Sequence, residues 1–281
     1  MNQSPSQTTH LFTNRQITAM LLPLMAEQLL ITLMGMVNTF MVAHVGPYAI
    51  SAVSLVDSIN ILVIQAFYAL STGGTIVCAQ YLGQKKTGHA IRSAEQTLFI
   101  VTLISLVTAT FCILFDRQIL RLIFGTVDEE VFNSARTYFF YSSLSYPCIA
   151  LYDAGSSIFR AQKNTGFPMA MSLIANIANV IGNIILVLIL GQGVAGAAIS
   201  TLAARALCAL LVLLRLVKPR ENQPVYVANY TRIRPHMPLI RRILHIGIPA
   251  GIENSMFQFG KLAIQSSVST LGVTAMAAHA M

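Results

Sequence analysis

Four carboxylate residues lie within long apolar runs of this chain, Glu27, Asp57, Asp153 and Glu253, while Glu95 lies at the start of a run close to Arg92. A charged carboxylate within a bilayer costs at least ~2.5 kcal/mol on insertion scales unless it is paired or hydrated. Shielding from water favours the protonated form, so such a group can bind and release a proton near neutral pH. We therefore treat Glu27, Asp57 and Glu253 as candidates for cation coupling. Asp57 is preferred to Asp153, which lies near a predicted helix end.

Two interpretations of Glu27 and Glu253 stay open, because each follows a proline by four residues near a predicted cytoplasmic helix end. Either these acids couple a cation, or they are interfacial and satisfy backbone groups freed at the proline kink. Lys261 could also neutralise one of the buried acids, which would make both charges structural. Arg160 and Lys163 are expected to contact lipid headgroups or to stabilise a turn.

Uncharged polar residues recur at helical spacing in the same runs. Ser172, Asn176, Asn179 and Asn183 form a continuous stripe, and Glu27 and Asn38 share a face about 16 Å apart along one helix. Looser stripes contain Asp57, Asn60, Tyr68, Ser71 and Thr75, and Asn254, Gln258, Lys261 and Gln265. Such stripes either line a water-filled cavity or join membrane helices by hydrogen bonds.

The composition requires a membrane protein. The chain has 281 residues, 55% hydrophobic and only 10% charged, whereas soluble domains carry about 25% charged residues. The mean hydropathy is +0.66, which excludes a soluble enzyme and a disordered protein. No nucleophile–base pair or metal-ligand spacing is present, so we expect no enzymatic activity, no metal site and no cofactor beyond a coupling ion.

Apolar runs long enough to cross a bilayer predict an all-α polytopic bundle. Seven such runs and the start of an eighth occur, at 17–43, 50–81, 93–115, 133–159, 168–190, 195–217, 243–270 and from 273 onward. Residues 218–242 contain four prolines and several arginines, which predicts a linker. The expected division is a cytoplasmic segment at 1–14, a six-helix lobe at 15–217, the linker at 218–242, and the start of a second lobe at 243–281.

The basic residues, which give a net charge of +8, follow the topology and do not indicate nucleic-acid binding. One side of the predicted membrane collects most of them, including Arg15, Lys85, Lys86, Arg160, Lys163, Arg215, Lys218, Arg241 and Arg242, and the other side only Arg117, Arg121 and Arg136. The positive-inside rule then places the N-terminus in the cytoplasm. We expect a multi-pass protein of a bacterial cytoplasmic membrane.

Residues 15–55 align without a gap to residues 241–281. Arg15, Pro23, Glu27 and Gly46 fall on Arg241, Pro249, Glu253 and Gly272. An even number of predicted helices separates the copies, so both cross the membrane in the same direction, as in transporters with parallel repeats. The second copy reaches Met281 after about one helix. The chain is therefore expected to be a fragment, or to need a partner that completes its second half.

A series of motifs resembles the multidrug and toxic compound extrusion (MATE) transporters. The motifs are Pro23-x3-Glu27-Gln28, the run 35–42, Ala79-Gln80-Tyr81-Leu82-Gly83, Phe159-Arg160-Ala161-Gln162, Gly193-x2-Gly196 with the run 197–201, and Ile246-Gly247-Ile248-Pro249. The resemblance implies two lobes of six helices each that export organic cations in exchange for protons or sodium ions. It also implies contact with membrane lipids and, for a complete chain, function as a monomer.

The resemblance also selects site residues, with two departures. Many bacterial members have an aspartate at the position of Asn38, and often another at that of Asn183, four residues after the asparagine matched by Asn179. The candidates for cation coupling are therefore Glu253, Glu27, Asp57, Asn38, Asn179 and Asn183. Candidates for the substrate cavity are Asn176, Gln28, Tyr68, Gln258, Lys261 and Thr201.

Three alternatives remain. A lipid-linked saccharide flippase has a related architecture, but it should present more basic residues to its cavity than Arg205 and Lys261, the only ones away from the ends of the predicted spans. A membrane-embedded enzyme would need a catalytic motif that the chain lacks. An inactive truncated fragment of a transporter is the third.

Overall fold

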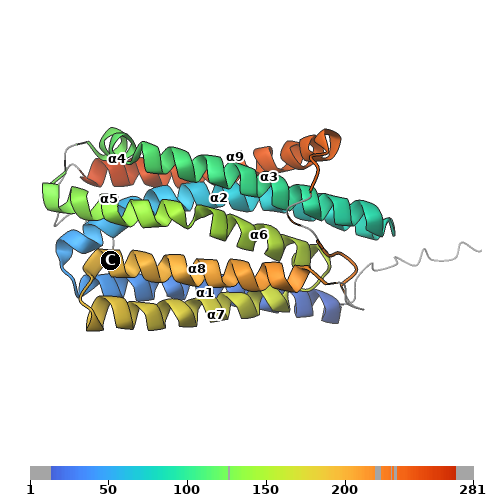
Figure 1. Ribbon diagram of the computed structural model, residues 1–281, viewed down its shortest axis with the longest axis horizontal. Helices are drawn as coiled ribbons and strands as arrows, with labels where there is room; N and C mark the ends of the chain where they lie inside the picture. Colours follow the sequence, from blue (N-terminus) through green and yellow to red (C-terminus); the bar gives the residue numbers. More distant parts are fainter. Residues whose placement is uncertain (1–13, 126, 219–222, 229, 231–232, 270–281) are drawn as a thin grey trace, which may run out of the picture.

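The computed structural model describes residues 14–125, 127–218, 223–228, 230 and 233–269. In this part of the chain, long helices lie side by side and their ends gather at two opposite ends of the bundle (Figure 1). The helices are α1 (Asn14–Ala43), α2 (Pro47–Gly83), α3 (Thr87–Leu114), α4 (Asp116–Phe124), α5 (Glu129–Leu144), α6 (Tyr146–Ala161), α7 (Gly166–Asn183), η1 (Ile184–Ile189), α8 (Gly193–Leu216) and α9 (Met237–Ser269). The predicted all-α membrane bundle is confirmed.

Five segments are long and apolar enough to cross a membrane: Thr18–Ala43, Pro47–Gly83, Thr87–Leu114, Gly166–Ile189 and Gly193–Leu216. They correspond to five of the six spans predicted for the first lobe. The predicted segment at 1–14 and the span from 273 onward lie almost wholly outside the described residues.

The prediction of one continuous helix over the remaining span, 133–159, is wrong. The structure divides it into α5 and α6 at Ser145. Pro147 in the first turn of α6 has no N–H to donate, and its ring cannot pack against a preceding helical turn. The Ser145 hydroxyl donates to the Ser142 carbonyl at 2.6 Å and accepts a hydrogen bond from Arg205 on α8 at 2.7 Å. The break is therefore buried, and the Ser145 hydroxyl joins it to α8.

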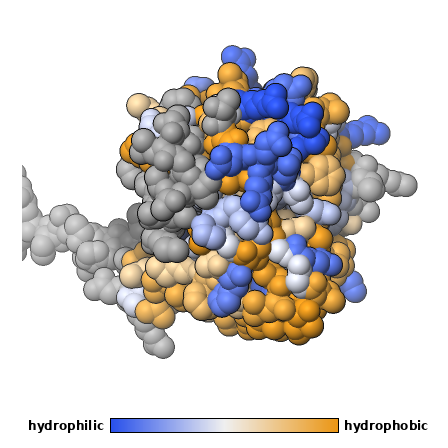
Figure 2. All heavy atoms as spheres, turned by 90° about the vertical axis from the view of Figure 1, so that its left-hand side faces the viewer, coloured by the Kyte–Doolittle hydropathy of each residue, from blue (hydrophilic) through white to orange (hydrophobic). Residues whose placement is uncertain are grey.

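Two further elements differ from simple predicted spans. Beyond Asn183, α7 continues into η1, a π-helical segment, and such segments are frequent at functional sites. The connection after the third span contains the short helix α4, in which Asp116 pairs with Arg136 at 2.6 Å. Figure 2 looks onto this end of the bundle, where hydrophilic side chains gather over one part and hydrophobic ones over another.

The predicted linker at 218–242 is shorter than expected, because α9 already begins at Met237 with a proline at its second position. Two glutamines hold its described part to the bundle. Gln162 bonds both the N–H and the carbonyl of Val225, and Gln96 bonds the carbonyl of Arg234 and the N–H of His236. Burial raises the pKa of Tyr230 to about 12, and its hydroxyl donates to the Leu213 carbonyl.

Helix α2 is the central element, packed against α3, α5, α6 and α9. Its approach to α9 requires glycine, since a Cβ on Gly73 would lie 2.5 Å from the Ile243 carbonyl oxygen. Helix α1 is peripheral and packs mainly on α7. Leu22 and Phe40 of α1 are 68% and 64% exposed, so apolar burial within the described chain holds α1 weakly.

Candidate functional site

One half of the lobe contains an uncharged amide cluster, formed by Asn38 of α1, Asn179 and Asn183 of α7, and Thr201 of α8. Asn183 Nδ2 donates to Asn38 Oδ1 at 2.7 Å and to Asn179 Oδ1 at 3.1 Å. Asn179 Nδ2 in turn donates to Thr201 Oγ1 at 3.0 Å. Four residues predicted separately, from a stripe and from the resemblance, therefore meet in one hydrogen-bonded chain across three helices.

Close helix packing positions this amide cluster. The Ser200 hydroxyl donates to the Asn179 carbonyl at 2.8 Å, and a Cβ on Gly182 would lie 2.3 Å from that hydroxyl oxygen. Asn179 and Asn183 are fully buried, and Asn183 Oδ1 has no hydrogen-bond partner. Asn176, one turn earlier in the stripe, donates to the Leu30 carbonyl of α1 at 3.2 Å. The polar face of α7 is thus directed at α1 and α8.

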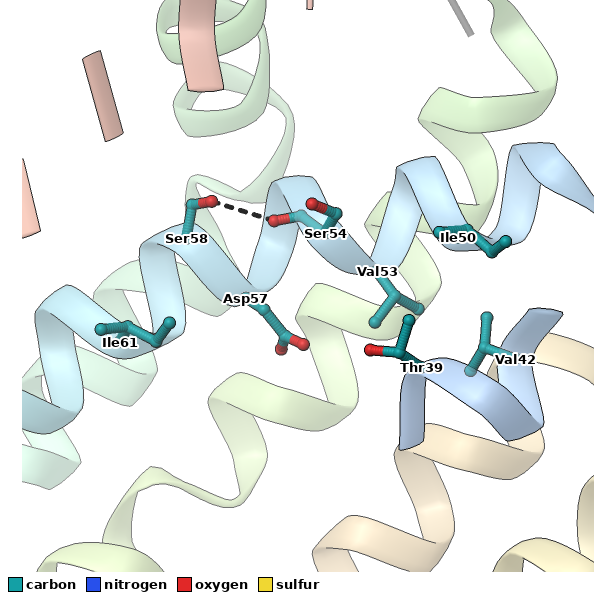
Figure 3. A pocket seen from close by; sticks show the side chains of 8 residues that line it. All are labelled: Thr39, Val42, Ile50, Val53, Ser54, Asp57, Ser58 and Ile61. Atoms are coloured by element: carbon teal, nitrogen blue, oxygen red, sulfur yellow. Dashed lines mark hydrogen bonds between the residues drawn. The ribbon is translucent and has the colours of Figure 1, made fainter. Parts of the chain in front are cut away.

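A second polar position is a cavity of about 200 Å³ between α1 and α2. Asp57 of α2 and Thr39 of α1 point toward each other across it (Figure 3). The rest of the lining is Val42, Ile50, Val53, Ser54, Ser58 and Ile61. A carboxylate in a wall whose lining residues are half apolar provides one negative charge and some hydrophobic surface, the combination that an organic cation requires.

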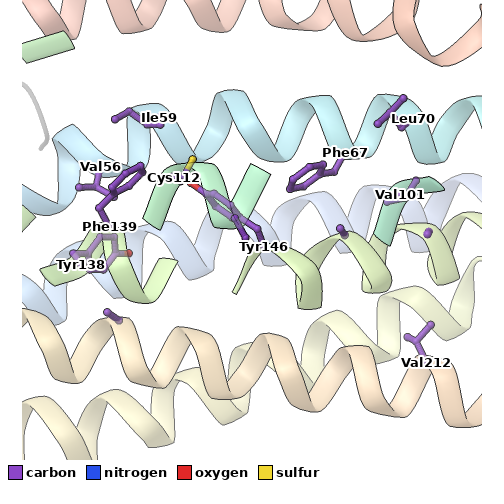
Figure 4. Packing of buried hydrophobic residues seen from close by; sticks show 14 of the residues in the cluster. Val56, Ile59, Phe67, Leu70, Val101, Cys112, Tyr138, Phe139, Tyr146 and Val212 are labelled. Atoms are coloured by element: carbon purple, nitrogen blue, oxygen red, sulfur yellow. The ribbon is translucent and has the colours of Figure 1, made fainter. Parts of the chain in front are cut away.

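Behind this cavity, Asp57 is held by polar side chains of the lobe interior. Its Oδ1 accepts a hydrogen bond from Asn60 Nδ2 at 3.1 Å, and Tyr146 donates to Asn60 Oδ1 at 2.9 Å. Tyr138 and Arg205 lie within electrostatic range of the same carboxylate. Tyr138 and Tyr146 also belong to the apolar core shown in Figure 4, with Phe67 and Phe139. Asp57 therefore connects the cavity to a rigid interior.

The third polar position lies in the opposite half of the lobe, where Glu27 of α1 pairs with Arg160 of α6. Arg160 Nη2 lies 2.7 Å from Glu27 Oε1, and the Tyr152 hydroxyl donates to the same oxygen at 3.2 Å. Glu27 is 3% exposed. The expectation that Arg160 contacts lipid headgroups or stabilises a turn is wrong, because its guanidinium points inward onto a buried acid.

The other predicted residues are more scattered. Tyr68 is 40% exposed, with Arg160 positioned over its ring at 5.9 Å. Gln28 and Glu253 have exposed side chains, on α1 and α9. The side chains of Gln258 and Lys261, and with them the suggested pairing of Lys261 with an acid, lie outside the described residues. The predicted stripes therefore do not all converge on one cavity.

Sequence reasoning missed the partners of the buried acids. Arg160 and Tyr152 lie more than one hundred residues from Glu27 in the chain, and Arg205 was noted only as a cation within a span. Asp153 was set aside as a helix-end residue, but the structure buries it to 9% exposure in the middle of α6. Pro147, six residues earlier, was the available signal, since a proline in an apolar run indicates that the helix restarts there.

Comparison with known proteins places this geometry in a known family. The MatE family model matches residues 23–185. "Probable multidrug resistance protein NorM" of Thermotoga maritima is 26% identical over 94% of this chain and 57% of its own length. "Multidrug export protein MepA" of Staphylococcus haemolyticus is 26% identical over 92% of this chain and 56% of its own. The chain thus spans a little more than half the length of these curated relatives.

A solved structure has the same fold. An inward-facing multidrug resistance MATE family transporter of the MOP superfamily superposes with a TM-score of 0.82. The match covers 94% of this chain and 60% of that chain, at 19% sequence identity. At that identity the likeness concerns the helical architecture alone.

Proposed function

Because the chain belongs to the MatE family, we propose that it forms the first lobe of a secondary active exporter that exchanges organic cations for protons or sodium ions by alternating access. The family match over residues 23–185 carries this proposal. The chain is a multi-pass membrane protein by its apolar helices, and the bacterial relatives favour a cytoplasmic membrane as its location. The N-terminus is proposed to be cytoplasmic, because the turns at 83–87 and 161–166 and the linker carry most of the loop Lys and Arg residues.

The cavity at Asp57 is the proposed contact for the organic cation in this lobe. Its single carboxylate supplies the charge, and Val42, Val53 and Ile61 supply the apolar surface. Candidates for the coupling ion are Glu253, Glu27, Asp57, Asn38, Asn179 and Asn183. Among these, the amide cluster provides neutral oxygens only, so by itself it can help to coordinate a cation but cannot neutralise one.

The proposal is tested by measuring ethidium export from proteoliposomes that contain the full-length protein encoded by the gene. An imposed proton or sodium gradient should drive export, and Asp57→Asn should lower the rate by roughly tenfold or more, since a charge-assisted contact contributes about 1.5–3 kcal/mol. Glu130→Gln is the matched control, because Glu130 is exposed in the first turn of α5.

Export of ethidium at the rate of empty liposomes, with folded protein present under both gradients, would reject the exporter. Equal rates for Asp57→Asn and Glu130→Gln would leave the exporter in place but remove the cavity at Asp57 as the cation contact.

A further inference from the structure

The charges inside the lobe do not balance among the described residues. Three carboxylates, Glu27, Asp57 and Asp153, are accompanied by two guanidiniums, Arg160 and Arg205. An uncompensated charge in a low-dielectric interior is costly, and the usual remedy is neutralisation. One of the three acids therefore needs a proton or another cation.

Hydrogen bonding distinguishes the three acids. Glu27 Oε1 accepts from both Arg160 and Tyr152, and Asp57 Oδ1 accepts from Asn60. Donors of this kind stabilise an ionised carboxylate. Asp153 differs because no side-chain donor of this kind is seen on it among the described residues, and its Oδ2 atom is buried without a hydrogen-bond partner at only 9% exposure. An ionised oxygen in that position would lack the donors that its charge requires.

The surroundings of Asp153 contain both signs of charge. Glu27, Arg160 and Arg205 lie within electrostatic range of it, and Tyr152 is adjacent in the chain. Tyr68 of α2 faces the Arg160 guanidinium. Glu27 Oε2 and Arg160 Nε are, like Asp153 Oδ2, buried without partners. Two acids within electrostatic range of each other, each with an unpartnered buried oxygen, are favourably arranged to hold one proton between them.

We propose that Asp153 is the proton-binding group of this lobe, carrying one exchangeable proton while Glu27 remains paired with Arg160. The proton comes from water and adds to Asp153 Oδ2, which turns an orphaned acceptor into an O–H donor. Glu27 Oε2 is an unpartnered acceptor on a group within electrostatic range of Asp153. As a coupling site, this assignment rests on the proposed export function, but proton binding itself does not.

The position favours a proton over a metal ion. A hard cation requires several oxygen ligands, and here one Glu27 oxygen is already bound to a guanidinium whose positive charge opposes a second cation. In the described part of the chain, no group of three His, Cys, Asp or Glu residues could hold a metal ion. The amide cluster, where the resemblance implies acids, has no carboxyl group to carry the proton. The proton is therefore assigned to an acid outside the amide cluster.

Infrared difference spectroscopy of the full chain in lipid nanodiscs, between alkaline and mildly acidic buffer, tests the assignment. One protonated-carboxyl band should appear on acidification, disappear in Asp153→Asn and remain in Glu130→Gln. Glu27→Gln should keep the band but shift its titration to more acidic pH, because Arg160 is then free to stabilise ionised Asp153. Circular dichroism would verify that each variant is folded.

A band lost in Glu27→Gln and retained in Asp153→Asn would overturn the assignment in favour of Glu27. Loss of the band on adding sodium chloride at constant pH, but not choline chloride, would overturn it in favour of a sodium site. The spectra need no transported substrate, so a failed export assay with the band present rejects the exporter and leaves the proton site. Normal export with no protonated-carboxyl band rejects the proton site and leaves the exporter.

Discussion

Two polar clusters hold α1 to its lobe, and they use different chemistry. In one half of the lobe, Asn38 joins an amide cluster in which neutral groups donate to neutral groups. In the other half, Glu27 joins an ionic cluster with Arg160 and Tyr152. Both lie on one face of α1, while much of the rest of that helix is exposed. Polar contacts at two levels, more than apolar burial, therefore fix the position of α1.

The difference between the clusters separates positioning from switching. A neutral hydrogen bond between membrane helices contributes little and does not depend on pH, so the amide cluster suits positioning. A buried ion pair is costly to break and responds to any change in protonation nearby. A change of protonation in the ionic cluster can thus alter the contact that holds α1. The difference between the two clusters can be tested by removing one partner from each in turn.

Removing Arg160 should have the largest effect. Arg160→Met leaves Glu27 buried at 3% exposure without its cation, and breaking a buried pair in this way costs about 3–5 kcal/mol. We expect a large loss of folded protein and a strongly lowered unfolding temperature in detergent micelles.

The double variant Glu27→Gln with Arg160→Met is the matched control for that loss. It removes both charges, so most of the stability should return, since a neutral replacement of a buried pair is often nearly neutral. If Arg160→Met alone unfolds like the unmodified protein, the ionic cluster does not anchor α1 and the comparison fails.

Placing an acid in the amide cluster should have an intermediate effect. Asn183→Asp removes the Nδ2 donor that reaches Asn38 and Asn179, and it directs a carboxylate at two carbonyl oxygens. Turning the Asn179 amide toward the new carboxylate would break its present Nδ2 bond to Thr201 Oγ1. Leaving buried groups unsatisfied costs about 1–3 kcal/mol each.

The stability of Asn183→Asp should depend on pH, and the direction of that dependence can be predicted. The ionised carboxylate is the unfavourable form in the fold, so the variant should lose stability as pH rises above the ordinary aspartate value of about 3.9. Chemical unfolding followed at several pH values measures this slope. A variant whose stability is independent of pH would show that water or a cation already satisfies the cluster.

The sequence allowed the helices to be predicted but not the pairing between them. Run length and hydropathy located the spans because every backbone group in a bilayer must be satisfied within its own helix. The Asn176–Asn183 stripe was predictable from its period. The break at Ser145 depends on Arg205 of another helix, and the burial of Arg160 depends on Glu27 across the chain. Such contacts depend on how neighbouring helices are rotated and shifted along their axes relative to one another. The periodicity of residues within one helix does not determine either quantity.

The smallest expected effect compares two threonines that face different partners. Thr201 accepts a hydrogen bond from Asn179 of another helix, whereas Thr39 bonds only the Gly35 carbonyl of its own helix among the bonds seen here. Thr201→Val should cost about 0.6 kcal/mol, and at most ~1.7, as for other interhelical bonds in membranes. Thr39→Val should change the stability less, because its helix keeps its backbone bonds. Equal unfolding midpoints for the two variants would mean that Asn179 finds another acceptor, and the amide cluster would then be less specific in its geometry than the ionic one.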